Sequence, residues 1–383
     1  MRRTSHFGSR SLLAFRKQLL GWYREHRRDL PWRARSGQRS RSPQKARLDP
    51  YRVWIAEIML QQTRIAAVLP YYERFLARFP DVESLARARE ADVLKLWSGL
   101  GYYSRARNLH RAAKEVVVRH GSQFPRELEA VLALPGIGSY TAAAILSIAY
   151  DIPLAVLDGN VARVLARLFA IRGDLRADGR WQQLGEAAQS LLAKNAAGDW
   201  NQGLMELGET ICTPRSPQCG RCPIARWCRA NALGLTERIP VPRRKRAVVR
   251  MEIAAAVLLD PRGRTLLVRD PGAHDDVLFS RMWQFPAVAV ASDAEAELAA
   301  HVRATTGVDC TNGTRLQRLE TARHGVTFRD ITLLPFLAHV AALPCLPRSR
   351  IVALGSIAQL QISSATRKIA AAATSAASEI RST

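Results

Sequence analysis

A glycine turn and a carboxylate between Leu134 and Asn160 form a pattern that could support chemistry. The segment reads LPGIGSYTAAAILSIAYDIPLAVLDGN, and Gly136 and Gly138 make a tight turn between two predicted helices. Free backbone N–H groups at the start of the second helix would bind an anion, for which a nucleic-acid phosphate is the obvious candidate. Asp158 then precedes the next helix. Taken alone, the pattern is more typical of a glycine turn followed by an aspartate helix cap.

A second carboxylate, Glu57, lies in the predicted helical segment YRVWIAEIMLQQTR, residues 51–64. The aromatic and aliphatic residues of this segment are expected to form a buried stripe with Glu57 at its edge. Burial would raise the pKa of Glu57, which could then donate a proton near neutral pH. The ordinary alternative is a solvated glutamate on a helix surface.

Four cysteines follow a C-x6-C-x2-C-x5-C pattern: Cys212, Cys219, Cys222 and Cys228. This density of thiols predicts metal binding, and both zinc and an iron–sulfur cluster accept four cysteine ligands. The unequal spacing favours a [4Fe–4S] cluster, because zinc sites more often use two separated CxxC pairs. Cys310 and Cys345 stand apart and are predicted to be isolated core thiols.

The composition indicates a globular protein with a polyanionic partner. The chain has 383 residues, of which 48% are hydrophobic, enough for two domains with a substantial core. Its 57 Lys and Arg residues against 33 Asp and Glu give a formal net charge of +24. Such an excess favours nucleic acid, through steering and counterion release. We find no signal-peptide pattern or membrane-spanning run, and we expect an intracellular protein without structural disulfides.

The residue pattern divides the chain into a helical part and an α+β part. Residues 49–230 show helical periodicity with short turns, and β-branched alternation is nearly absent. Residues 236–250, TERIPVPRRKRAVVR, combine prolines with basic residues and are predicted to be a linker. Strand-like segments and one helix follow from residue 251. The basic segment 34–47 is predicted to be a mobile loop, and residues 371–383 a flexible tail.

An aromatic turn lies between Gly99 and Arg105, where the sequence reads GLGYYSR. Aromatic side chains on such turns can enter a stack of nucleic-acid bases, and Tyr102 and Tyr103 are placed beside arginines. The two tyrosines could equally pack in the protein interior.

Together, these motifs resemble the adenine DNA glycosylases of the MutY type, in the endonuclease III (helix-hairpin-helix) superfamily. The resemblance covers residues 11–235 and rests on LPWR, EIMLQQT, GLGYYSRARNL, LPGIGSYTA, LDGNVARVL and the cysteine spacing, all in family order. It implies an all-α catalytic part, residues 1–235, with a helix-hairpin-helix and a [4Fe–4S] loop at 212–228. It also implies excision of adenine mispaired with 8-oxoguanine in DNA.

The resemblance also implies roles for individual residues. Glu57 matches the proton donor to adenine N7, and Asp158 matches the carboxylate that stabilises the cationic sugar. The other matches organise the catalytic site (Tyr140, Asn160), form the adenine pocket (Arg33, Leu60, Glu206) or insert into the duplex (Gln62, Tyr102).

The chemistry of base removal is consistent with this assignment. Breaking an N-glycosidic bond develops positive charge on the sugar, so an acid is needed on the leaving base and an anion near C1′. The adenine must first be flipped out of the duplex, which is easiest at a mispair. Bifunctional relatives carry a lysine nucleophile at the position of Tyr140. The tyrosine therefore predicts a monofunctional glycosylase.

Residues 251–370 resemble, less closely, the Nudix-like α+β domain with which this family reads 8-oxoguanine. The match rests on Met282-Trp283-Gln284-Phe285-Pro286, and the glutamate cluster of true Nudix hydrolases is missing. We therefore expect this domain to bind rather than hydrolyse. Arg323 and His324 occupy the place of the family's lesion-contacting Phe-Ser-His turn, although two of three positions differ. Residues 363–368 look like the family's closing segment.

Two alternatives remain open. One is an endonuclease III-like glycosylase acting on mismatched or oxidised pyrimidines, against which Tyr140 and the second domain count. The other is a non-catalytic DNA-binding module, against which the presence of both Glu57 and Asp158 counts. The favoured interpretation implies a cytoplasmic, bacterial nucleoid-associated monomer. Its partner would be double-stranded DNA with adenine opposite 8-oxoguanine or guanine.

Overall fold

The structure is a computed structural model that describes residues 7–34, 48–177, 179–241, 247–269, 282–310, 314–326, 328–360 and 362–382. It forms two compact units. The first combines Met1–Ala88 with Ser104–Arg244, and the second combines Arg89–Tyr103 with Lys245–Thr383. The predicted mobile loop at 34–47 lies, apart from Ala34, outside the described residues.

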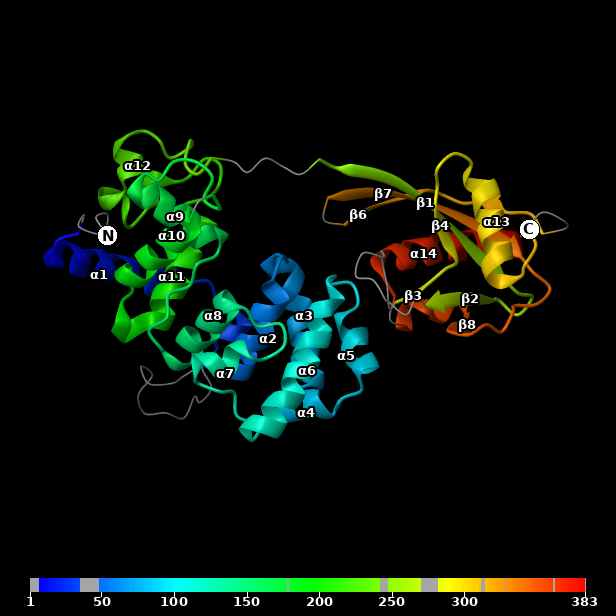
Figure 1. The fold of residues 1–383 in the computed structure, drawn as a ribbon, viewed down its shortest axis with the longest axis horizontal. Coiled ribbons are helices and arrows are strands. Elements are labelled where there is room, and N and C mark those ends of the chain that lie inside the picture. Colours follow the sequence, from blue (N-terminus) through cyan, green and yellow to red (C-terminus); the bar gives the residue numbers. More distant parts are fainter. Residues whose placement is uncertain are drawn as a thin grey trace. The chain divides into compact units, whose positions relative to one another are not determined.

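The first unit is helical, as the sequence predicts, and no strand is assigned in its described residues (Figure 1). Its helices are α1 (Ser9–His26), α2 (Pro50–Leu60), α3 (Ile65–Arg78), α4 (Val82–Arg87), α6 (Tyr103–His120), α7 (Leu128–Leu132), α8 (Ser139–Tyr150), α9 (Gly159–Phe169), α10 (Arg180–Leu191), α11 (Ala197–Thr210) and α12 (Arg229–Ala232). None of the described helices is both long and apolar enough to cross a membrane.

Helix α11 occupies the centre of the first unit and packs against α1, α8 and α9. Trp200, Leu204 and Leu207 of this helix are buried in the main core. Burial of side chains of this size contributes roughly 1.5–3 kcal/mol each. Two glycines let the neighbouring helices approach closely. A Cβ atom on Gly198 would lie 2.7 Å from a backbone oxygen of α8, and one on Gly208 would lie 2.8 Å from the Cβ atom of Asn160.

The second unit is built on one mixed sheet. Its strands are β1 (Val249–Leu259), β2 (Arg264–Arg269), β3 (Trp283–Gln284), β4 (Ala287–Ala289), β5 (Gln317–Arg318), β6 (Ala322–Val326), β7 (Arg329–His339) and β8 (Ser349–Ala353). The order is β3-β2-β1-β7-β5, with β4 also paired to β1, β6 to β7 and β8 to β2. The long central pair β1–β7 is parallel, with Val249 opposite Arg329 and Leu259 opposite His339.

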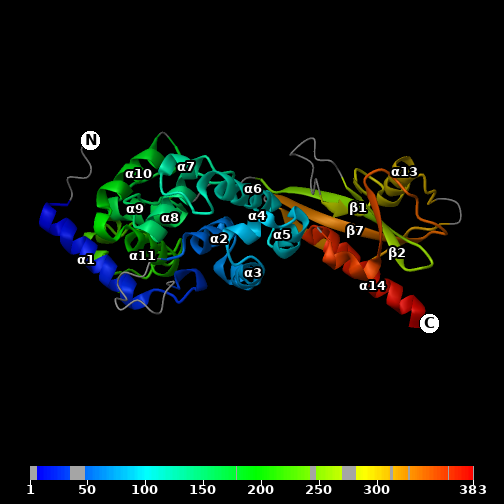
Figure 2. The same ribbon diagram turned by 90° about the horizontal axis from the view of Figure 1, so that it is seen from below.

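Two helices cover opposite faces of this sheet (Figure 2). Alternate residues of β1 point to opposite sides, as expected for a strand. Ala255 and Val257 pack with α14 (Ser364–Ser382), whereas Ala254 and Ala256 pack with α13 (Ala294–Thr306). The second unit also includes α5 (Glu90–Trp97) and the turn that follows it. The predicted α+β class of the C-terminal part is therefore confirmed.

Three details differ from the sequence predictions. The prediction of a flexible tail at 371–383 is wrong for most of that segment, because α14 continues to Ser382 and Ala373 is fully buried. Alanine has the highest helix propensity, so this alanine-rich segment forms a helix once one face is covered. The linker at 236–250 begins later than predicted, because Ile239 is buried against Ala166 in the first unit. Residues 89–103, predicted within the first domain, group with the second unit.

Candidate active site

One cavity of the first unit brings together the residues that the sequence marked as catalytic. Glu57, Tyr140, Asp158 and Asn160 all line it, although they come from three different helices or their ends. Its volume of about 930 Å³ is within the range of small-molecule sites and is large enough for a nucleoside. The predicted adenine-pocket residues line the same cavity: Arg33, Leu60 and Glu206.

Helix α2 positions Glu57 in this cavity. The Asp49 side chain caps the helix by accepting a hydrogen bond of 2.9 Å from the Tyr51 N–H, and Pro50 occupies the first turn. The helix packs between α3 and α8, and every residue from Val53 to Met59 is buried, so Glu57 is only 7% exposed. This burial is deeper than the stripe edge that the sequence pattern predicted. It raises the pKa of Glu57 to about 7. The charge of Asp158 adds to the increase, while a Tyr140 hydrogen bond opposes it.

Asp158 caps the start of α9. Its Oδ1 accepts a hydrogen bond of 2.7 Å from the Val161 N–H. Burial raises the pKa of Asp158, whereas the backbone N–H groups of Val161 and Asn160 oppose this by stabilising the anion. The positive end of the helix dipole acts in the same direction. The cap that the sequence offered as an ordinary alternative is therefore present, and the same carboxylate also lines the cavity.

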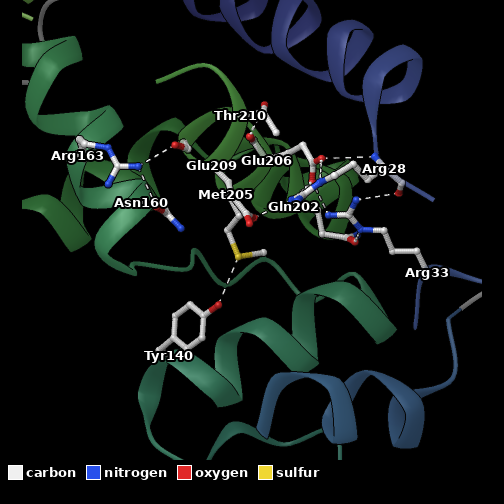
Figure 3. Close-up of polar contacts among 11 residues, drawn as sticks. Arg28, Arg33, Tyr140, Asn160, Arg163, Gln202, Met205, Glu206, Glu209 and Thr210 are labelled. Atoms are coloured by element: carbon white, nitrogen blue, oxygen red, sulfur yellow. Dashed lines mark hydrogen bonds and ion pairs between the residues drawn. The ribbon is translucent and has the colours of Figure 1, made fainter. Parts of the chain in front are cut away.

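Tyr140 enters the cavity from the first turn of α8. Its hydroxyl lies 3.3 Å from the Met205 sulfur (Figure 3). Burial raises the pKa of Tyr140 well above its usual value, and the charges of Glu57 and Asp158 add to the increase. The phenol is therefore neutral and keeps its proton.

The predicted glycine turn joins α7 to α8 as a helix-hairpin-helix. Gly136 has a φ of 80°, which favours glycine, and a Cβ atom there would lie 2.7 Å from the Cβ atom of Asn108. Gly138 is the N-cap residue of α8, and no atom lies within 4 Å of where its Cβ would be. Backbone N–H groups of the first turn of α8 are thus available for an anion beside this open position.

Helix α11 forms the polar wall of the cavity (Figure 3). Glu206, 1% exposed, accepts a hydrogen bond from Arg28 and one of 2.8 Å from Arg33. Burial alone would raise the pKa of Glu206, but the two arginines outweigh it and the pKa is lowered. Gln202 accepts a hydrogen bond of 3.1 Å from Arg33, and Glu209 one of 2.7 Å from Arg28. The wall therefore presents an ionised carboxylate held by two guanidinium groups.

Several residues of this wall were not singled out from the sequence. Arg28, Gln202, Met205 and Glu209 all line the cavity. Gln202, Glu206 and Glu209 are spaced four and then three residues apart, which places them on one face of a helix. That spacing of polar residues along one helix face was the available signal. No comparable signal marks Arg28.

Gln62 and Tyr102, the predicted duplex-inserting residues, are not among the described residues that line the cavity. Each lies in a turn and has a positive φ, 57° for Gln62 and 49° for Tyr102. Arg105 holds the turn at the end of α2. Its Nη1 donates to the carbonyl oxygens of Ile58, Met59 and Gln61 at 2.9, 2.8 and 2.6 Å. No sequence pattern predicts this buried role of Arg105.

The four predicted metal-binding cysteines surround a second, small cavity of the first unit, and Arg167 also lines it. Nη1 of Arg167 donates to the Cys212 sulfur at 3.2 Å and to the Thr213 carbonyl oxygen at 2.7 Å. Burial raises the pKa of Cys222 to about 12, and the nearby thiols add to the increase. Four thiol groups around one cavity, with a donor to sulfur beside them, fit an iron–sulfur cluster.

Helix α9 connects the two cavities. Arg163 donates to the Asn160 side chain at 2.8 Å and to the Cys212 carbonyl oxygen at 2.8 Å. Arg167, one turn further along, holds the cysteine loop. The helix that Asp158 caps therefore carries the contacts that fix the cysteine loop.

The predicted lesion-reading residues lie in the second unit. Arg323 and His324 are in β6, opposite Thr332 and Ile331 of β7. The Lys368 ammonium group donates to the Arg323 carbonyl oxygen. Burial lowers the pKa of His324, and the charge of Lys368 adds to this effect. Met282 and Phe285 of the Met-Trp-Gln-Phe-Pro segment, residues 282–286, are buried in the same unit.

Comparisons with known proteins agree with this arrangement. Residues 55–188 match the HhH-GPD superfamily of base excision DNA repair proteins. Residues 212–228, which span the four cysteines, match the iron–sulfur binding domain of endonuclease III. The helical fold and these two matches are those of a helix-hairpin-helix protein of this superfamily, and its cysteine loop is a [4Fe–4S] site.

Curated relatives narrow the family further. The chain is 46% identical to the adenine DNA glycosylase of Rattus norvegicus over 219 residues, 57% of this chain and 42% of that protein. It is 37% identical to that of Arabidopsis thaliana over 322 residues, 76% of this chain and 50% of that protein. The solved structure of a thermostable thymine-DNA glycosylase covers 58% of this chain and 97% of its own, with 29% identity and a TM-score of 0.50.

The chain belongs to the adenine DNA glycosylases of the MutY type, within the endonuclease III superfamily. It spans about half the length, or less, of the rat and plant relatives. The Arabidopsis match covers more of the chain than the helical unit alone contains, so it extends into the second unit.

Proposed function

We propose that this protein is a monofunctional DNA glycosylase that hydrolyses the N-glycosidic bond of adenine mispaired with 8-oxoguanine or guanine in double-stranded DNA. The observation that carries the proposal is the single cavity lined by Glu57, Asp158 and the arginine-held Glu206. The net charge of +24 supports a DNA substrate. Rat and plant relatives named adenine DNA glycosylase support the choice of base.

Glu57 supplies the proton. Its pKa of about 7 leaves a large fraction protonated at neutral pH, as a general acid requires. Protonation of adenine at N7 lets the electron pair of the C1′–N9 bond leave with the base. Water then adds to C1′, and its proton returns to the Glu57 carboxylate. The acid is thereby regenerated, and the products are adenine and an abasic site.

Asp158 stabilises the positive charge that develops on the sugar. Two buried carboxyl groups in one site do not both ionise readily, and their environments decide which one keeps the proton. Asp158 accepts backbone N–H hydrogen bonds at a helix start, and these favour its anion. Glu57 has fewer hydrogen-bond donors. The proton therefore resides on Glu57 and the negative charge on Asp158.

Glu206 and its arginines select the base. An ionised glutamate held by Arg28 and Arg33 can accept a hydrogen bond from the exocyclic amino group of adenine. Thymine and guanine present a carbonyl oxygen at the equivalent position, which a carboxylate repels. Selectivity of this kind reaches several kcal/mol when a buried polar group would be left unpaired.

Two further parts of the proposal concern the duplex and the lesion. Gly136 and Gly138 are assigned to a phosphate contact at the start of α8, and Gln62 and Tyr102 to insertion beside the flipped base. Arg323 and His324 of the second unit, a Nudix-like domain in this proposal, read the 8-oxoguanine. The lowered pKa of His324 keeps its imidazole neutral and able to accept a hydrogen bond.

A single assay separates this function from its alternatives. Purified full-length protein is incubated with duplexes carrying A opposite 8-oxoguanine, A opposite G, T opposite G, or thymine glycol, and abasic sites are cleaved with alkali. The proposal predicts cleavage of the adenine strand in the first two duplexes only, and only after alkali. Cleavage at thymine or thymine glycol would support the pyrimidine alternative. Efficient borohydride trapping of a covalent adduct would overturn the monofunctional mechanism.

A further inference from the structure

The turn that carries Tyr102 belongs to the second unit. Gly99, Gly101 and Tyr102 have positive φ values of 104°, 77° and 49°. The left-handed conformation costs a non-glycine residue roughly 1–2 kcal/mol, so the surrounding structure must hold Tyr102 in place. One contact within the turn is a 3.1 Å hydrogen bond from the Trp97 indole to the Gly101 carbonyl oxygen. Tyr102 itself is 43% exposed.

Two hydrogen bonds attach this turn to the start of α14. The Tyr103 hydroxyl donates to the carbonyl oxygen of Ile362 at 2.9 Å. Nη2 of Arg367 donates to the Ser98 hydroxyl at 2.6 Å. These contacts lie on both sides of Tyr102 in the sequence. They therefore constrain the turn at its two ends.

The start of α14 is itself firmly held. The Ser363 hydroxyl accepts a hydrogen bond of 2.9 Å from the Thr366 N–H, and both side chains are buried. Ala365 and Ile369 pack in the core between the helix and the sheet. The beginning of α14 is thus a rigid support and not a frayed helix terminus.

The beginning of helix α14 also holds strand β6. The side chain of Lys368, next to Arg367, donates to the carbonyl oxygen of Arg323 at 2.5 Å. Neighbouring residues of α14 therefore bind the turn that bears Tyr102 and the strand that bears Arg323 and His324.

We propose that the first turn of α14 is a positioning element, in which Arg367 and Lys368 fix the duplex-inserting turn and the lesion-reading strand relative to each other. The inference rests on the proposed function, in which Tyr102 enters the duplex and Arg323 and His324 contact 8-oxoguanine. Holding both elements on one rigid support sets the spacing at which they reach the same base pair. A mispair of A with G contains no 8-oxoguanine to contact. Loss of this spacing should therefore slow adenine release opposite 8-oxoguanine more than release opposite G.

The test uses single-turnover adenine release with saturating full-length enzyme on duplexes containing A opposite 8-oxoguanine and A opposite G. Ser98→Ala and Arg367→Met each remove the same hydrogen bond. Each is expected to lower the ratio of the two rate constants by about tenfold, equivalent to about 1.4 kcal/mol. Ser98→Ala also removes a 3.4 Å contact from the Tyr103 hydroxyl, so the double variant should lower the ratio no further than Ser98→Ala alone. Lys368→Met should also lower the ratio, and Lys368→Arg should largely restore it.

Arg350→Met is the matched control, since Arg350 is an exposed arginine of β8 in the same unit. It should leave the ratio unchanged. Amide hydrogen exchange across residues 98–103 provides a readout that does not need activity, and Arg367→Met should accelerate it whereas Arg350→Met should not. Unchanged exchange, or equal rate losses on both duplexes, would overturn the inference. Wild-type protein that releases no adenine would instead refute the proposed function, and the exchange result would still decide whether Arg367 holds the turn.

Discussion

Glu57 and Asp158 share one cavity although they come from helices far apart in the sequence; burial raises the pKa of Glu57, and the negative charge of Asp158 adds to the increase. Both line one buried cavity, so each affects the ionisation of the other. This relationship gives one of the carboxyl groups a proton to donate and leaves the other as an anion, as removal of a base from its sugar requires.

The first prediction concerns the pH dependence of base release. Glu57 must be protonated to act as the acid, and its pKa is about 7. The single-turnover rate should therefore fall as the pH rises above about 7, approaching tenfold per pH unit. Rate constants measured between pH 5.5 and 9 with saturating enzyme check this. A rate that stays constant up to pH 9 would show that Glu57 is not the proton donor.

The same pKa predicts how Glu57 affects stability. The folded-state pKa lies above the ordinary value of 4.5, so the fold favours the protonated form. This contribution is fully present below pH 4.5 and is lost as the pH rises through about 7. Glu57→Gln, which cannot ionise, should therefore raise the free energy of unfolding at pH 8 by on the order of 2–3 kcal/mol relative to wild type. Urea unfolding at pH 5 and pH 8 measures the difference, which should shrink to below about 1 kcal/mol at pH 5.

Removal of the Glu206 charge should lower both the stability of the protein and its rate of adenine release. Glu206 is buried between Arg28 and Arg33. Breaking a buried ion pair typically lowers the free energy of unfolding by about 3–5 kcal/mol. Glu206→Gln should lower the free energy of unfolding by roughly 2–4 kcal/mol and strongly reduce adenine release. Glu209→Gln is the control, because Glu209 pairs only at the exposed edge of Arg28 and should cost below about 1 kcal/mol. Equal effects of the two substitutions would contradict the role assigned to Glu206 in the polar wall of the cavity.

Arg167 should be needed to retain the cluster. It holds the Cys212 sulfur and two carbonyl oxygens of the cysteine loop. Arg167→Met should lower the iron and sulfide content per protein and the visible absorbance. Arg172→Met, which changes an exposed arginine just beyond α9, should retain both. Full iron content in Arg167→Met would show that the loop does not depend on this contact.

The sequence predicted the site better than it predicted the surroundings of the site. Glu57, Tyr140, Asp158 and Asn160 stand in short motifs, and the structure brings them into one cavity. Arg28 and Arg105 escaped prediction because their roles depend on tertiary contacts. Arg28 pairs with glutamates of α11, and Arg105 with carbonyl oxygens at the end of α2, and neither partner is close in sequence.

The boundary between the units was mispredicted for a related reason. Helical periodicity reports that residues 89–103 are helix and turn, but it does not report which neighbours they contact. Tyr103 and Ser98 bind residues of the C-terminal segment, and these long-range contacts place the turn in the second unit. The α14 helix was missed because its alanine-rich sequence lacks the polar pattern of an exposed helix.

The most direct test of the central claim is single-turnover release of adenine opposite 8-oxoguanine by wild type, Glu57→Gln and Asp158→Asn, with DNA binding measured in parallel. If an acid and a fixed anion act together, each substitution should reduce the rate by at least about a thousandfold while binding persists. Near-normal turnover by either variant that still binds the duplex would contradict the account.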